Sequence, residues 1–155
     1  PNAEQLAEIA INTAAVARTF DMTTQVAFLS LSNFGSTRDP KVEKVQKAVR
    51  LLSERGVDFA FDGEMQADVA FDIALREETF PFCDLKGEPN VLIFPDLQSA
   101  NIAYKLLTRL SRAKAIGPLL VGMSHPVNIL QLGSDVATIE SLATITAVEA
   151  AMGTY

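Results

Sequence analysis

The stretch Gln25-Val26-Ala27-Phe28-Leu29-Ser30-Leu31 is a short apolar run, and it predicts a buried β-strand. Residues 3–20 precede it with apolar side chains at helical spacing. Residues 39–54 follow it with the same spacing, between Asp39 as N-cap and Gly56 as the C-terminal stop. A buried strand between two amphipathic helices predicts an α/β fold.

The same alternation continues along the chain. Further extended segments are predicted at residues 57–62, 90–94 and 114–122, and further helices at residues 65–77, 96–111 and 135–152. This order predicts a three-layer α/β/α arrangement around a mostly parallel sheet. Ligands bind such sheets beyond the carboxyl ends of the strands, so we expect a site in the loops after residues 31, 62, 94 and 122.

The composition narrows the class of protein. The 155 residues suffice for one domain, and 48% of them are hydrophobic, as expected for a substantial core. A net charge of −6 argues against nucleic acid or anionic lipid as a partner, and no apolar run reaches the ~18 residues of a membrane span. With Cys83 and His125 as the single cysteine and histidine, we expect neither a disulfide nor a zinc site, and we expect a cytoplasmic protein.

The two ends of the chain suggest an incomplete unit. Pro1 stands where an initiator methionine would be, so the chain is interpreted as a piece of a longer polypeptide. Residues 135–152 form a helix with almost no polar face, which has to be buried. We expect it to pack on a missing part of the polypeptide or on a partner chain; the alternative is a central helix of this domain.

Two features are candidates for binding an anion. The loop Ser30-Leu31-Ser32-Asn33-Phe34-Gly35-Ser36 offers hydroxyls and N–H groups before a helix, although it lacks the P-loop pattern. The other interpretation of this loop is a simple turn. Cations recur every third residue beside it, where they would either attract a polyanion such as coenzyme A or form a solvated helix face: Arg38, Lys41, Lys44, Lys47 and Arg50.

Other polar positions also have two interpretations. Asp62 and Glu64 serve either acid–base chemistry or turn formation. Ser99 and Asn101 are placed to face a ligand at the start of a helix, and His125 is either an exposed imidazole or a general base. A chain held around a flat or phosphorylated ligand is indicated by Gly117, Pro118, Gly122, Pro126 and Asn128.

Five stretches together carry a family resemblance from about residue 3 to residue 150. They are Val26–Ser36, Asp62–Asp68, Val91–Asp96, Ala100–Lys105 and Ile116–Asn128. In order and spacing they resemble the phosphotransacetylase family. The resemblance implies an isocitrate/isopropylmalate-dehydrogenase-like fold of two α/β domains with the active cleft between them, working as a dimer. Residues 1–134 would be the second α/β subdomain, and residues 135–155 the helix that packs on the missing first one or on a partner chain.

The resemblance also implies that the catalytic residues have been replaced. Active members carry Ser-Arg-Gly and an Asp five residues after that Gly; here Gln131, Leu132 and Thr138 stand for the Ser, Arg and Asp. Leu132 cannot neutralise a developing oxyanion, and Thr138 cannot act as a base near neutral pH. Asp135 would compensate only if the register slipped. We therefore predict no catalytic residue in this segment.

Domains with these replacements occur at the C-terminus of bacterial NADP-dependent malic enzymes. The loop at residues 32–36 also resembles the corresponding loop of those domains. The expected function is thus an acetyl-CoA-sensing and oligomerisation domain, with malate, NADP and a divalent metal bound elsewhere. The alternatives are an active phosphate acetyltransferase and a dimerisation domain with a vestigial pocket. The residues expected to bind acetyl-CoA or a related thioester are Ser30, Ser32, Asn33, Gly35, Ser36, Ser99, Asn101, Lys105, Gly117, Pro118, Gly122, Pro126, Asn128 and Gln131.

Overall fold

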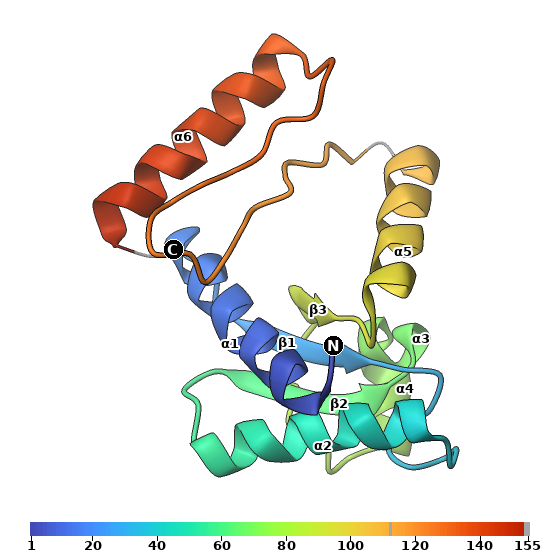
Figure 1. The fold of residues 1–155 in the computed structure, drawn as a ribbon. Helices are drawn as coiled ribbons and strands as arrows, with labels where there is room; N and C mark the ends of the chain where they lie inside the picture. The colour runs from blue at the N-terminus through green and yellow to red at the C-terminus, as the bar shows by residue number, and fades with distance from the viewer. Residues whose placement is uncertain (112, 154–155) are drawn as a thin grey trace.

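A three-stranded parallel sheet in the order β2-β1-β3 forms the centre of the computed structural model, which describes residues 1–111 and 113–153 (Figure 1). The strands are β1 (Gln25–Leu29), β2 (Ala60–Met65) and β3 (Val91–Ile93). In the register, Val26 of β1 lies opposite Phe61 on one side and Val91 on the other. The strand predicted at residues 25–31 is thus confirmed as the middle strand, although it ends at Leu29.

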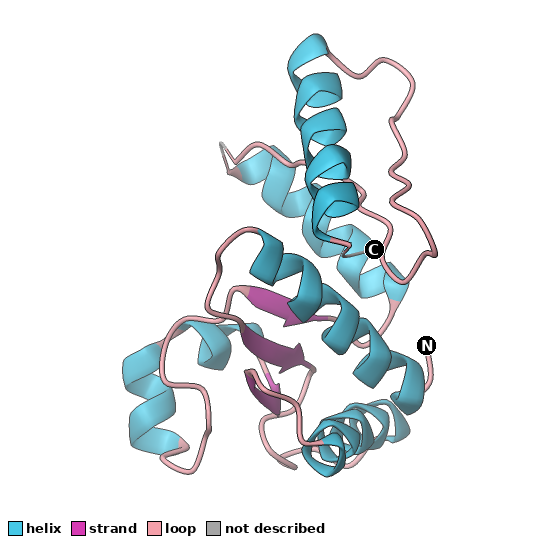
Figure 2. Ribbon diagram, turned by 90° about the vertical axis from the view of Figure 1, so that its left-hand side faces the viewer, coloured by secondary structure: helices cyan, strands magenta, loops and turns pink. Residues whose placement is uncertain are grey.

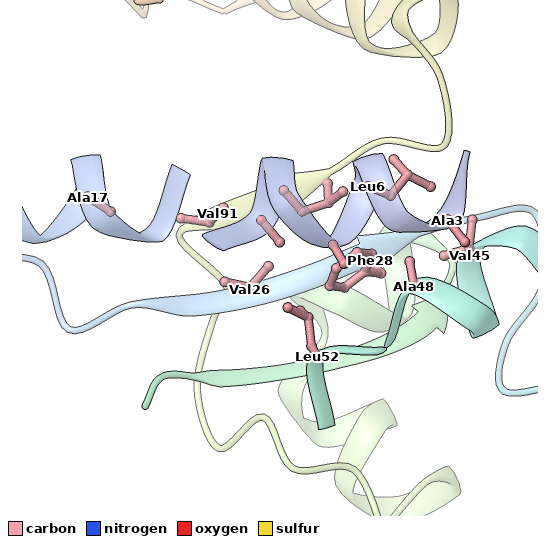
Figure 3. Close-up of a cluster of buried hydrophobic side chains, with 12 residues drawn as sticks. Ala3, Leu6, Ala17, Val26, Phe28, Val45, Ala48, Leu52 and Val91 are labelled. Atoms are coloured by element: carbon pink, nitrogen blue, oxygen red, sulfur yellow. The ribbon is translucent and has the colours of Figure 1, made fainter. Parts of the chain in front are cut away.

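Helices cover both faces of this sheet, so the predicted α/β/α layering is confirmed (Figure 2). Helices α1 (Ala3–Thr19) and α2 (Pro40–Arg55) pack on one face. The buried cluster there joins four elements (Figure 3): Leu6 from α1, Val26 and Phe28 from β1, Leu52 from α2 and Val91 from β3. On the other face, α3 (Ala67–Phe71) and residues 83–85 pack on β1 and β2.

Local capping explains where α1 begins and where α2 begins and ends. The Asn2 side chain accepts from the amide of Gln5 at 2.8 Å, and the Gln5 side chain accepts from the amide of Asn2 at 2.9 Å. Asp39 caps α2 by accepting from the amide of Lys41, and Gly56 ends it in the left-handed conformation.

Two predicted elements are wrong in their bounds. The strand expected at 57–62 begins at Ala60 and continues to Met65, so Asp62 and Glu64 belong to β2 itself. The helix expected at 65–77 is two helices, α3 and α4 (Ile73–Thr79), because Asp72 between them is extended. The Asp72 side chain caps the amide of Leu75 at 3.0 Å, which starts a new helix there.

Arg76 of α4 is buried, which the sequence does not predict. Its guanidinium donates to backbone carbonyls on both sides of it in the chain, among them Ala70 at the end of α3 and Gly87, the latter at 2.6 Å. Because an arginine presents five donors in a fixed fork, one side chain joins the two segments that cover this face of the sheet.

Cys83 lies in the same buried layer and should be unreactive. Burial, opposed by a hydrogen bond from the backbone at Leu85 and reinforced by the nearby Asp62 carboxylate, raises the pKa of the Cys83 thiol to about 11. Since the thiolate is the reactive form, we expect iodoacetamide at pH 8 to modify the native protein at least about 100-fold more slowly than the urea-unfolded protein. Alkylation followed by mass spectrometry measures this, and equal rates would contradict the burial of this residue.

The last third of the chain stands away from the sheet. Helices α5 (Leu97–Leu110) and α6 (Val136–Met152) project from the same side of the α/β unit in both views (Figures 1 and 2). The extended segment predicted at 114–122 forms only one antiparallel bridge, between Leu119 and Asn128.

Both outer helices are poorly covered by the described residues. Helix α5 has no buried residue there, and Leu97 and Leu110 are 81% and 84% exposed. Helix α6 buries only Leu142 and Glu149 and contacts α1. Within the described residues this helix does not occupy the central position considered as the alternative. Residues 154–155 of the predicted C-terminal segment lie outside the described residues. Across residues 1–111 and 113–153, no helix has both the length and the apolar character needed to cross a bilayer.

Candidate functional site

A cavity of about 400 Å³ lies between α5 and the loops that precede and follow residue 120. Its size falls within the range of small-molecule sites. It is lined by five residues of α5 and by four loop residues: Leu97, Ala100, Asn101, Tyr104, Lys105, Ile116, Gly117, Pro118 and Gln131. Five predicted ligand residues thus come together here, namely Asn101, Lys105, Gly117, Pro118 and Gln131.

The lining combines an apolar wall with a few polar groups. The Lys105 ammonium lies 5.0 Å from the centre of the Tyr104 ring, which holds a cation beside an aromatic face. Asn101 and Gln131 add amide groups that both donate and accept hydrogen bonds. Such a lining suits an elongated ligand that has an anionic or polar part and an apolar part.

Gly117 gives the cavity wall its backbone geometry. Its φ of +137° is one that residues with a side chain rarely adopt, and a Cβ there would lie 3.3 Å from the amide nitrogen of Leu119. The peptide bond to Pro118 is cis. The position therefore favours glycine for conformational reasons, whatever ligand the cavity takes.

The start of α5 is fixed by charge and capping. Asp96 accepts hydrogen bonds from the amide and the hydroxyl of Ser99 at 2.8 and 2.9 Å, and these bonds, together with nearby lysines of α2, lower the pKa of the Asp96 carboxyl. Lys44 of α2 donates to the carbonyl oxygen of Pro95 at 2.7 Å. The Ser99 hydroxyl thus serves the helix cap, and Ser99 is not among the residues that line the cavity.

The row of cations on α2 lies mainly on a solvated face. Lys44 anchors the start of α5, and Lys47 pairs with Glu4 of α1 at 2.6 Å. Arg38, Lys41 and Arg50 are exposed. The solvated-face interpretation therefore describes the row better than a ligand-binding patch.

The loop at residues 30–36 closes on a buried carboxylate. Glu64 is 1% exposed, and its Oε1 accepts from the Ser32 hydroxyl at 2.8 Å and from the Gly35 amide at 2.7 Å. The amide of Phe34 donates to the carbonyl of Glu64 at 2.8 Å, and Ser30 donates likewise to Met65. The amides of Ser30, Phe34 and Gly35, which were expected to hold an anion, thus donate within the protein.

The side chains of this loop are engaged in the same way. Ser36 Oγ accepts from the amide of Asn33 at 2.9 Å, and Asn33 Oδ1 accepts from the amide of Gln66 at 2.6 Å. The structure does not bring Ser30, Ser32, Asn33, Gly35 or Ser36 into the cavity lining. The turn interpretation fits this geometry. It also fits Asp62, because the Asp62 carboxylate accepts from the amides of Gly63 and Asp84.

The positions that the resemblance assigns to catalytic residues lie in the loop before α6 and in its first turn. Leu132 is fully exposed, while Gln131 lines the cavity. Asp135 is the N-cap of α6, and hydrogen bonds from Thr138, first from its side chain and then from its amide, lower the pKa of the Asp135 carboxyl. An aspartate held in this way is a weaker base than a free one, which argues against Asp135 as a general base.

The family model for phosphate acetyl/butaryl transferases matches residues 1–147 of the chain. The chain belongs to this family. A phosphate acetyltransferase of Treponema pallidum is 45% identical over 152 residues, which cover 96% of this chain and 45% of that protein. A phosphotransacetylase structure from Streptococcus pyogenes matches 98% of this chain and 46% of its own length, with a TM-score of 0.93 and 44% identity. The chain thus spans about half the length of these relatives.

A second kind of relative is much longer. An NADP-dependent malic enzyme of Rhizobium meliloti is 41% identical over 150 residues, which make up 97% of this chain but only 20% of that protein. A segment similar to this chain therefore also forms a minor part of a protein named as a malic enzyme. The resemblance stated from the sequence is confirmed on both counts.

The remaining predicted residues of this phosphotransacetylase-like chain lie outside the cavity. Pro126 and Asn128 border a second hollow of about 480 Å³ between their loop and α6. Gly122 approaches the side chain of Asn12 on α1, and His125 is exposed. Neither Gly122 nor His125 is among the residues that line either hollow.

Sequence reasoning missed several lining residues and one organising residue. Tyr104, Leu97 and Ile116 line the cavity, and their helical spacing or apolar character predicts core positions instead. The sequence predicts a turn or acid–base role for Glu64, whereas in the structure Glu64 organises the loop at residues 30–36. In the sequence, the one indication of this role of Glu64 is its place at the end of a predicted strand.

Proposed function

We propose that this chain is the acetyl-CoA-sensing domain of an NADP-dependent malic enzyme, with a phosphotransacetylase fold that has lost its catalytic residues. One observation carries the proposal: Leu132 and Thr138 stand where the family chemistry needs a cation and an acid. A thioester can then be held, but its exchange with phosphate lacks a base and a charge that stabilises the transition state.

The ligand site of this proposal is the cavity beside α5. Lys105 meets the phosphates of the coenzyme, and the apolar wall formed by Leu97 and Ile116 meets its thioester end. Malate, NADP and the divalent metal bind in the part of the polypeptide outside this chain, where malate is converted to pyruvate and CO₂. The largely apolar α6 packs on the first phosphotransacetylase-like subdomain or on a second copy in a homodimer or higher oligomer.

An active phosphate acetyltransferase is the second candidate, and the relatives favour it as strongly. The Treponema pallidum and Bacillus subtilis proteins that carry this name are 45% and 41% identical to the chain. Acetyl-CoA binding belongs to both candidates, so binding alone does not separate them. Turnover and regulation do.

The test uses the complete polypeptide that contains this chain. Calorimetry should show binding of acetyl-CoA, and malate oxidation followed at 340 nm should change when acetyl-CoA is added, because feedback requires different affinities for two states. Binding without any change in malate oxidation would remove the sensing role. The absence of binding would leave a dimerisation domain with a vestigial pocket.

Lys105 gives a prediction within the site. Replacing Lys105→Met should raise the Kd for acetyl-CoA about fivefold, because a partly exposed charge contact contributes about 1 kcal/mol. The matched control is Arg109→Met, which removes an exposed cation one turn further along α5 and outside the cavity lining. Calorimetry measures both variants, and equal losses would mean that only the general charge of α5 matters.

A further inference from the structure

Asn128 uses every polar atom of its side-chain amide inside the protein. Its Oδ1 accepts from the amide of Leu120 at 3.0 Å, and its Nδ2 donates to Thr146 Oγ1 at 3.0 Å and to Glu149 Oε2 at 2.8 Å. The orientation of the amide is fixed, because a backbone donor faces its oxygen and two acceptors face its nitrogen. Asn128 therefore joins the loop to α6 and leaves no donor for a ligand.

The burial of Glu149 makes the contact between this loop and α6 sensitive to substitution. It is 1% exposed, and its Oε1 has no hydrogen-bond partner among the described residues. Among the described residues, the side-chain hydrogen bond to the Glu149 carboxylate comes from Asn128. A buried carboxylate that loses its donor is strongly unfavourable, so the two side chains should act as a pair.

Asn128 is close in sequence to the residues of the cavity wall. Asn128 faces Leu119 in the antiparallel bridge, next to Gly117 and Pro118, and it precedes Gln131 by three residues. Gly117, Pro118 and Gln131 line the side of the cavity formed by the loops. Asn128 therefore contacts both α6 and the loop strand that leads to the cavity wall.

We propose that Asn128 and Glu149 form a positioning clamp that sets the loop wall of the ligand cavity according to the place of α6. Asn128 is then a positioning residue and not a ligand contact. The inference rests on the proposed function, because it assigns to this pair the task of shaping the acetyl-CoA site.

A double-mutant cycle in the complete polypeptide tests the clamp. Asn128→Ala and Glu149→Ala should each raise the Kd for acetyl-CoA about tenfold, and the double variant should also lose about tenfold instead of about 100-fold. Glu149→Gln should stay within about threefold of the parent, because its amide oxygen still accepts from Asn128. Glu140→Ala, which removes an exposed carboxylate of the same helix, should leave the Kd unchanged.

Hydrogen exchange supplies the readout that a general loss of stability would not reproduce. The amides of residues 119–128 should exchange faster in both alanine variants, while those of β1 keep their protection. Additive losses of affinity, a Glu149→Gln variant as weak as Glu149→Ala, or lost protection in β1 would each overturn the clamp. If the parent protein does not bind acetyl-CoA, the proposed function fails, and the exchange of residues 119–128 alone decides whether the clamp exists.

Discussion

Acetyl phosphate synthesis should begin when Gln131→Ser, Leu132→Arg and Thr138→Asp are combined in the complete polypeptide. These changes place the hydroxyl, cation and acid of active family members in α6 and in the loop before it. Single groups that stabilise a developing oxyanion contribute on the order of 100-fold to 1,000-fold in rate. We therefore expect the triple variant to exceed the parent rate by at least about 100-fold.

The folded structure should tolerate this change. Leu132 is fully exposed, and position 138 lies in the first turn of α6, where a carboxylate is favoured by the helix dipole. The matched control combines Gln131→Ser, Leu132→Met and Thr138→Asn, which keeps similar shapes but adds neither the cation nor the acid. A coupled assay of acetyl phosphate measures the rates. A triple variant that still binds acetyl-CoA but stays at the control rate would contradict the assignment of these positions.

Arg76→Leu should destabilise the protein by about 3–4 kcal/mol. The buried guanidinium donates to carbonyls at the end of α3 and in the loop before β3, and leucine removes this donor from carbonyls that are buried or half-buried. Each unsatisfied buried group costs about 1–3 kcal/mol, and partial relaxation of the loop reduces the sum. Urea unfolding followed by circular dichroism measures the loss, with the midpoint lowered at an unchanged slope.

Arg55→Leu is the control for Arg76→Leu. Arg55 pairs with Glu8 on the surface, and exposed ion pairs contribute at most about 1 kcal/mol. The two variants therefore remove the same side chain from a solvated and from a buried position. Equal losses of the free energy of unfolding would show that Arg76 does not bridge the two segments.

The sheet and its first two helices could be predicted because their signals are local. The apolar run at 25–31 has no polar interruption before Ser30, and Asp39 with Gly56 marks the ends of α2 to within a residue. Asp72 was missed as a helix break because nothing around it contains the usual Gly or Pro. Its side chain caps the start of α4 instead. Because aspartate also occurs within other helices and turns, the residue type alone does not mark a helix break.

Long-range contacts explain what the sequence could not predict about the site. The loop at residues 30–36 has the composition of an anion site, yet the carboxylate that occupies its donors comes from Glu64, 29 residues after Gly35. In the same way, Asn128 meets Glu149 across 21 residues. By contrast, Asn101 and Lys105 lie on one helical face, so their shared place in the cavity follows from spacing alone.

The central claim is that this fold holds a coenzyme A thioester without exchanging its acyl group. The most direct measurement is the rate of acetyl phosphate formation by the unmodified complete polypeptide, at acetyl-CoA concentrations that calorimetry shows to be saturating. We predict a rate no higher than that of the Leu132→Met, Thr138→Asn, Gln131→Ser control. A rate of about 10 s⁻¹, which is ordinary for an enzyme, would contradict the claim and identify the chain as part of a working acyltransferase.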